Sequence, residues 1–66
     1  MIIKANKMIR ADNHIYVVSN KIAGTDLRYV KDIIIGRPGY KIYRLSVEDL
    51  RRLFHVKKRE KFIIED

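Results

Sequence analysis

The chain has 66 residues, 47% of them hydrophobic, and its 15 Lys and Arg against 8 Asp and Glu give a formal net charge of +7. This length allows one domain, 1–66, and a chain of this size buries only about 60% of its unfolded surface. The absence of cysteine excludes disulfides and thiolate metal sites, and two histidines are too few for a structural zinc site, so we expect no cofactor.

The N-terminal third of the chain predicts a β-hairpin. Residues 2–10 alternate imperfectly between apolar and polar, and residues 14–19 form a clearer strand rich in β-branched side chains. A short polar turn at 11–13 joins them, because Asp and Asn tolerate the left-handed backbone positions that such a turn demands. Residues 19–26 are expected to follow as a loop.

Residues 25–36 fit either a helix or a strand. For a helix, Thr25 would cap the first turn, and apolar residues follow at helical spacing. These apolar residues are Leu27, Val30, Ile33 and Ile34. For a strand, the β-branched triplet Ile33–Ile35 loses side-chain freedom in a helix, and a turn signal follows directly. We favour a strand over 29–35, which is compatible with one helical turn at 25–28.

A second hairpin is the best-specified element of the sequence. Strands at 29–35 and 40–45 flank a turn in which Pro38 fixes φ and Gly39 supplies the positive φ of a type II turn. A bare type II turn splays paired strands, so Gly36 is expected to add a bulge or a wider loop.

A short amphipathic helix is predicted for 47–57. Ser46 and Asp49 match the capping-box pattern, a hydroxyl followed three residues later by a carboxylate. Lys57 and Lys58 would lie in the last turn, where cations suit the helix dipole. The apolar stripe of this helix consists of Val47, Leu50, Leu53 and Phe54.

The C-terminal segment 61–66 carries an apolar triplet that breaks the helical stripe. We expect a closing edge strand, a mobile tail or a segment that pairs with a second copy. The whole chain predicts an α+β fold, mainly β: a small, strongly bent antiparallel sheet or SH3-like barrel of two hairpins, with one short C-terminal helix. This order of elements and the basic charge resemble the SH3-like barrels of small archaeal chromatin proteins, which implies DNA binding.

The charge favours a polyanionic partner, and nucleic acid is the partner we expect. No apolar run approaches the length of a membrane span, and the N-terminus lacks the layout of a signal peptide. We therefore expect no membrane partner and a cytoplasmic protein, associated with the nucleoid if it binds DNA.

Cationic and aromatic side chains gather on the second hairpin. They are Arg37, Lys41, Tyr43 and Arg44. In an extended strand Lys41 and Tyr43 share one side, and Arg44 lies on the other. If Lys41 and Tyr43 are exposed, they place a cation beside a flat ring, which suits contact with phosphate and packing on a base. Alternatively, the tyrosines lie at the edge of the core and the charges only solvate the surface.

A second cationic group follows in and beyond the predicted helix. It comprises Arg51, Arg52, Lys57, Lys58 and Arg59. Cations aligned on a helix can follow a phosphate backbone, and five of them within nine residues favour binding over a merely solvated face.

We predict a small, non-enzymatic nucleic-acid-binding protein, with DNA favoured over RNA, that contacts phosphates through Lys and Arg and packs tyrosines on the ligand. An alternative is a protein-interaction module of viral, phage or host type, which docks or dimerises through its apolar C-terminal edge. The residues of that edge are Phe62, Ile63 and Ile64. A third interpretation is a small ribonuclease that uses His55, but such an enzyme needs a second proton-transfer group, and His14 is remote in the sequence.

Overall fold

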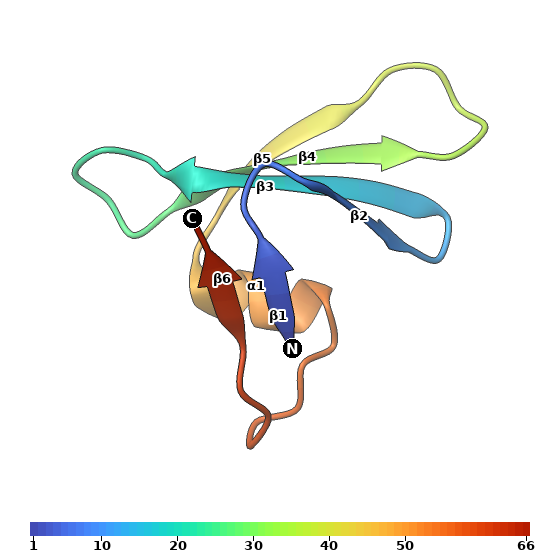
Figure 1. The fold of residues 1–66 in the computed structure, drawn as a ribbon. Coiled ribbons are helices and arrows are strands. Elements are labelled where there is room, and N and C mark those ends of the chain that lie inside the picture. Colours follow the sequence, from blue (N-terminus) through green and yellow to red (C-terminus); the bar gives the residue numbers. More distant parts are fainter.

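The computed structural model describes residues 1–66, which form six strands and one helix (Figure 1). In chain order these are β1 (Ile2–Lys4), β2 (Met8–Ala11), β3 (His14–Lys21), β4 (Arg28–Ile34), β5 (Lys41–Leu45), α1 (Val47–Leu53) and β6 (Ile63–Glu65). Strands β2 to β5 form an antiparallel sheet in the order β2-β3-β4-β5. The fold is therefore α+β and mostly strand, as the sequence predicts.

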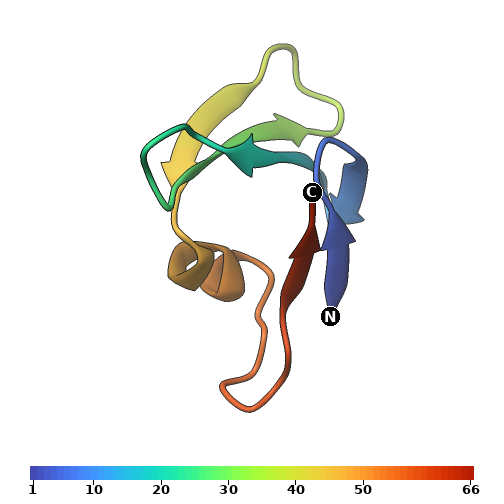
Figure 2. The same cartoon turned by 60° about the vertical axis from the view of Figure 1, so that its left-hand side comes forward.

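The strands do not close into a barrel. After β5 the chain enters α1, and β6 then pairs in parallel with β1 as a separate two-stranded sheet. Both views place α1 and the β1–β6 pair on one side of the four-stranded sheet and leave its other side uncovered (Figures 1 and 2). The SH3-like barrel that the order of elements suggests is not confirmed, because β5 remains an edge strand.

Both expected hairpins form. The two-residue turn between β2 and β3 places Asp12 at φ 53°, a left-handed position that Asp tolerates. Strand β4 resolves the ambiguity of 25–36 in favour of a strand, and the turn that follows it contains Gly36 and Gly39, both at positive φ.

Three details differ from the sequence-based expectation. Strand β3 continues to Lys21, because a bulge after Val18 allows the ladder with β4 to resume. No helical turn precedes β4; instead the N–H of Ile22 donates to the carbonyl of Leu27, 2.8 Å away, and closes the loop. Residues 2–10 are not one strand either, since Asn6 at φ 64° bends the chain between β1 and β2.

The core lies between the four-stranded sheet, α1 and the β1–β6 pair. Val18, Val30 and Leu50 have no solvent exposure, and Ile3 and Tyr16 are also buried. Around these five pack partly buried side chains: Ile9, Ala11, Leu45, Leu53, Phe54, Phe62 and Ile64. We call the side of the four-stranded sheet that faces this core the inner face.

Helix α1 begins as predicted but ends early. The Ser46 side chain accepts from the N–H of Asp49, and the Asp49 carboxylate accepts from the N–H of Ser46, which completes the capping box. The helix stops at Leu53, so Lys57 and Lys58 lie in the following loop rather than in a last turn. Val47 is exposed, and the apolar stripe starts at Leu50. No helix of the structure is long and apolar enough to cross a bilayer.

The early stop is a Schellman motif with an unusual residue at its left-handed position. The N–H of Val56 donates to the carbonyl of Arg51 at 2.8 Å, and the N–H of His55 donates to the carbonyl of Arg52 at 3.2 Å. His55 has φ 54°, a conformation for which glycine is the usual residue. A sequence search for helix ends that looks for glycine therefore misses this one.

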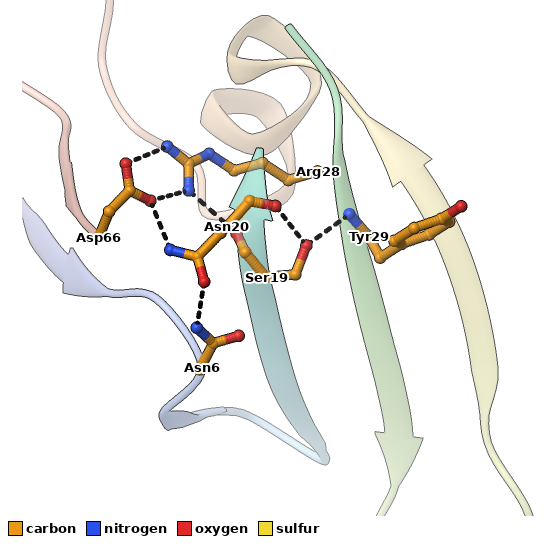
Figure 3. Close-up of polar contacts among 6 residues, drawn as sticks. All are labelled: Asn6, Ser19, Asn20, Arg28, Tyr29 and Asp66. Carbon is orange, nitrogen blue, oxygen red and sulfur yellow. Dashed lines mark hydrogen bonds and ion pairs between the residues drawn. The ribbon is translucent and has the colours of Figure 1, made fainter. Parts of the chain in front are cut away.

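A buried arginine joins the last strand to the sheet (Figure 3). Arg28 on β4 is only 6% exposed, and its Nη1 donates to Asp66 Oδ1 at 2.5 Å and to the Ser19 carbonyl at 2.9 Å. Asn20 Nδ2 also donates to Asp66 Oδ1, at 3.2 Å, and Asn6 Nδ2 donates to Asn20 Oδ1 at 2.7 Å. The segment after β6 is thus fixed to β3, β4 and the bend after β1.

The Arg28–Asp66 pair predicts loss of stability in acid. Hydrogen bonds from Arg28 hold the pKa of Asp66 below its ordinary value. The pair therefore stabilises the fold fully above that ordinary value, and the stabilisation is lost as pH falls from there through the lowered pKa of the folded state. We expect Asp66→Asn to lower the melting temperature at neutral pH, and the difference from the parent protein to shrink below about pH 4. Thermal unfolding followed by circular dichroism between pH 7 and pH 2 measures this. Asp26→Asn, which removes a carboxylate without an ion pair, is the control and should leave the profile unchanged.

The left-handed residue at the end of α1 predicts a stabilising substitution. A side chain at this φ costs roughly 1–2 kcal/mol, part of which is offset by the greater backbone freedom of glycine in the unfolded chain. His55→Gly should therefore raise the free energy of unfolding by roughly 0.5–1 kcal/mol, measured by urea denaturation. His55→Ala keeps the steric conflict and should give no gain; equal effects of both variants would contradict the explanation.

Candidate nucleic-acid interface

The uncovered side of the four-stranded sheet carries an unusual set of side chains. Because directly paired residues point to the same side, the register places them together. We call this side the outer face; its strand residues are Met8, Arg10, Ile15, Val17, Tyr29, Lys31, Ile33, Ile42 and Arg44. The exposed side of an antiparallel sheet is commonly polar, whereas here most of these residues are apolar or aromatic.

The apolar side chains of the outer face are exposed to solvent. Met8 is 77% exposed, Ile42 57% and Tyr29 48%, while the aliphatic residues on β3 and β4 between them are partly covered by their neighbours. Tyr40, just before β5, joins this face, because the Nζ of Lys31 lies 4.3 Å from the centre of its ring. A contiguous exposed surface of this kind is typical of a binding site rather than of scattered apolar residues.

The cations of the outer face lie on a diagonal. Three paired rows cross the sheet: Arg10–Ile15–Ile33, then Met8–Val17–Lys31–Ile42, then Tyr29–Arg44. Arg10 on β2, Lys31 on β4 and Arg44 on β5 each occupy a different row. We call these three residues the cation diagonal; at ordinary strand spacings it spans roughly 20 Å along the sheet.

No carboxylate lies on the outer face. Of the eight in the chain, Asp12 and Asp26 lie in turns, Asp32 points to the inner face, and the other five belong to 46–66. Residues 1–45 hold nine cations and three carboxylates, so this part contributes +6 of the net charge of +7. Most of the net positive charge is therefore carried by the segment that contains the sheet.

Strand β4 orients the outer face by turning two ionisable residues inward. Arg28 is held by Asp66, and Asp32, which is 8% exposed, lies 2.7 Å from Nδ1 of His14. The alternating pattern then leaves Tyr29 and Lys31 on the outer side. The N–H of Tyr29 faces the bulge in β3, and it donates to the Ser19 hydroxyl at 2.9 Å (Figure 3).

The hairpin residues predicted from the sequence are divided between the two sides of the sheet. Arg44 is exposed on the outer face, whereas Lys41 and Tyr43 pair with Asp32 and Val30 of the inner face. Both remain exposed, because β5 is an edge strand. Arg37 is exposed in the β4–β5 turn. The structure thus places Arg44 on the same side of the sheet as Lys31 and Arg10, and on the opposite side from Lys41 and Tyr43.

The predicted helix cations do not form a continuous stripe. The Arg51 guanidinium donates to the carbonyls of Lys57, Lys58 and Glu60 at 2.8, 3.3 and 2.9 Å, so it organises the loop after α1. Arg52 pairs with Asp49 at 3.3 Å. The side chains of 57–59 are exposed and make no ion pair, but their loop lies at the end of the molecule opposite the four-stranded sheet (Figures 1 and 2).

The apolar C-terminal edge is mostly used within the molecule. Phe62 and Ile64 pack against the core, and the rings of Phe62 and Phe54 lie 6.2 Å apart. Ile63 is 47% exposed and pairs with Ile2, which is also exposed, on the outside of the two-stranded sheet. Of the residues predicted to contact a partner, Ile63 is the one that is exposed, whereas Phe62 and Ile64 are partly buried.

The two histidines are far apart in the sequence but border the same hollow in the structure. His14, on β3, stacks on Tyr16 with ring centres 5.3 Å apart, and both line a hollow that His55 and Arg52 also border. Burial raises the pKa of the Tyr16 hydroxyl, and the negative charge of Asp32 adds to the effect. Tyr16 therefore remains a neutral hydrogen-bonding group at physiological pH.

Sequence reasoning missed most of the outer face, namely Met8, Arg10, Tyr29, Lys31, Tyr40 and Ile42. The signal that identifies them is the pairing register of three hairpins, which decides the face of each residue. Strand β4 hides that signal, because its buried side carries Arg28 and Asp32 while its exposed side carries Tyr29 and Ile33.

Comparison with known proteins gives no family: no protein-family model, no curated protein and no solved structure matches this chain.

Two neighbouring valines test which side of the sheet faces outward. Val18→Thr places a hydroxyl in the core and should reduce the free energy of unfolding by about 1–3 kcal/mol. Val17→Thr makes the same change on the outer face, where water reaches the hydroxyl, and should cost less than half as much. Urea denaturation of both variants gives the comparison, and equal losses would contradict the assigned register.

Proposed function

We propose that this protein is a small, non-enzymatic nucleic-acid-binding protein whose outer face is the binding surface. The observation that carries the proposal is the cation diagonal: three cations interleaved with exposed aromatic and aliphatic side chains, with no carboxylate among them. Lys and Arg supply the contacts to phosphate, and the side chains between them supply surface for sugars and bases.

Charged and apolar side chains alternate on the outer face, and this argues against both a second copy of the chain and a membrane as the partner. Lys31 pairs directly with Val17 and Ile42, so a second copy packed on this face would bury like charges against each other. A membrane would have to accept the same lysine among the inserted aliphatic side chains, whereas membrane-bound surfaces separate cations from the apolar side. A nucleic acid accepts both, because phosphates alternate with flat apolar bases along the strand.

Salt dependence provides the first test of this proposal. Contact with three phosphates predicts that log affinity falls with log salt concentration at a slope of roughly −2 to −3. Fluorescence anisotropy with a labelled oligonucleotide of mixed sequence, at several salt concentrations, measures the slope. No binding at low salt would overturn the proposal.

A matched pair of charge variants locates the surface. The first replaces Arg10, Lys31 and Arg44 with Gln, and the second makes the same replacement at Lys57, Lys58 and Arg59, so each lowers the net charge by three. We expect the first variant to lose affinity by at least about tenfold and the salt slope to become shallower by up to about three. The second variant should bind nearly as the parent protein does. If the second variant lost more affinity than the first, the binding surface would be the loop after α1 and not the outer face.

A further inference from the structure

We infer that the outer face accepts a single strand, DNA or RNA, that crosses the sheet along the cation diagonal. The inference rests on the proposed function and specifies its ligand. Its basis is the position of the apolar side chains: Met8, Val17 and Tyr29 lie on one side of the diagonal, and Ile15, Ile33 and Ile42 lie on the other.

A duplex offers little to these apolar side chains. Its base faces are stacked inside the helix, and the grooves present mainly hydrogen-bonding edges lined by phosphates. On the outer face Arg10, Lys31 and Arg44 could reach such edges, but the aliphatic side chains between them would be left without a partner. A single strand instead exposes the flat faces of its bases, and burial of those faces against aliphatic and aromatic side chains is favourable.

The two exposed tyrosines of the outer face each lie beside a cation of the diagonal. Tyr29 pairs directly with Arg44 across β4 and β5, and Tyr40 lies under the ammonium group of Lys31. A base that stacks on either ring therefore places its own phosphate near a positive charge. This repeated arrangement of ring and cation is the unit that single-strand-binding surfaces use.

The length of the diagonal sets the size of the ligand. Its span of roughly 20 Å accommodates about four nucleotides of an extended strand, at the lower end of the site sizes of small single-strand-binding domains. We therefore expect a minimal ligand of about four nucleotides, and little further gain in affinity per site for longer strands.

Four probes separate the contributions of phosphate, base and sugar. They are a labelled 12-residue oligo-dT, the same strand with abasic sites throughout, a 12-base-pair duplex and a 12-residue oligo-U. Measured by anisotropy at one salt concentration, oligo-dT and oligo-U should bind at least about tenfold more tightly than the abasic strand, which keeps the phosphates but offers no base to stack. The duplex should bind more weakly than oligo-dT despite its greater charge.

Matched tyrosine substitutions test whether the bases of the ligand stack on the outer face. Tyr29→Ala and Tyr40→Ala should each weaken binding to oligo-dT by roughly 5- to 150-fold, the range for one stacked base, and leave binding to the abasic strand nearly unchanged. Tyr43→Ala removes an exposed tyrosine from the inner side of β5 and should not reduce affinity. Circular dichroism of the three variants establishes that each is folded.

The outcomes distinguish the inference from the proposed function. Tighter binding to the duplex than to oligo-dT, or equal binding to oligo-dT and the abasic strand, would overturn the single-strand inference while nucleic-acid binding stands. Absence of binding to all four probes would overturn both, and binding only to vesicles of anionic lipid would identify a membrane surface instead. Preference between oligo-dT and oligo-U then assigns DNA or RNA.

Discussion

The structure depends on β4 turning Arg28 and Asp32 toward the core. A charged side chain is costly to bury unless a partner and hydrogen bonds compensate it. Asp66 and the Ser19 carbonyl compensate Arg28, and His14 lies within hydrogen-bond distance of Asp32. No buried side-chain polar atom is left without a partner. Because strand residues alternate, this choice sends Tyr29, Lys31 and Ile33 to the opposite side.

That orientation links the stability of the fold to its proposed activity. Slipping β4 by one residue would exchange its two sides, so that Val30 would be exposed and Lys31 buried. The Arg28–Asp66 pair opposes such a slip from one end of the strand, and the His14–Asp32 contact opposes it from the other. The inner face therefore specifies the pattern of ring and cation on the outer face, although the two share no side chain.

The sequence predicts the elements of this fold better than their orientation. Turn residues at 36–39 and the capping box at Ser46 act locally, so both hairpins and the start of α1 could be predicted. The end of α1 could not, because His55 occupies a position where glycine is the usual signal. Pairing of β1 with β6 and the inward turn of Arg28 depend on contacts with residues more than thirty positions away, which local patterns do not encode. The outer face was missed because β4 carries Arg28 and Asp32 on its buried side, which hides from the sequence which side faces solvent. Arg44 is the one residue of this face that was predicted as a site.

The pairing of β1 with β6 has a consequence for the order of folding. The four-stranded sheet joins segments that are neighbours in the chain and uses no residue after β5, whereas Ile3 remains without its strand partner until Ile64 is in place. Loop closure over some sixty residues is slow compared with hairpin formation. During folding the outer face would thus exist before the core beneath it is sealed, and the partly folded sheet would expose apolar surface on both sides at once. The positive charge that the sheet carries would then oppose association of two partly folded chains until β1 and β6 pair.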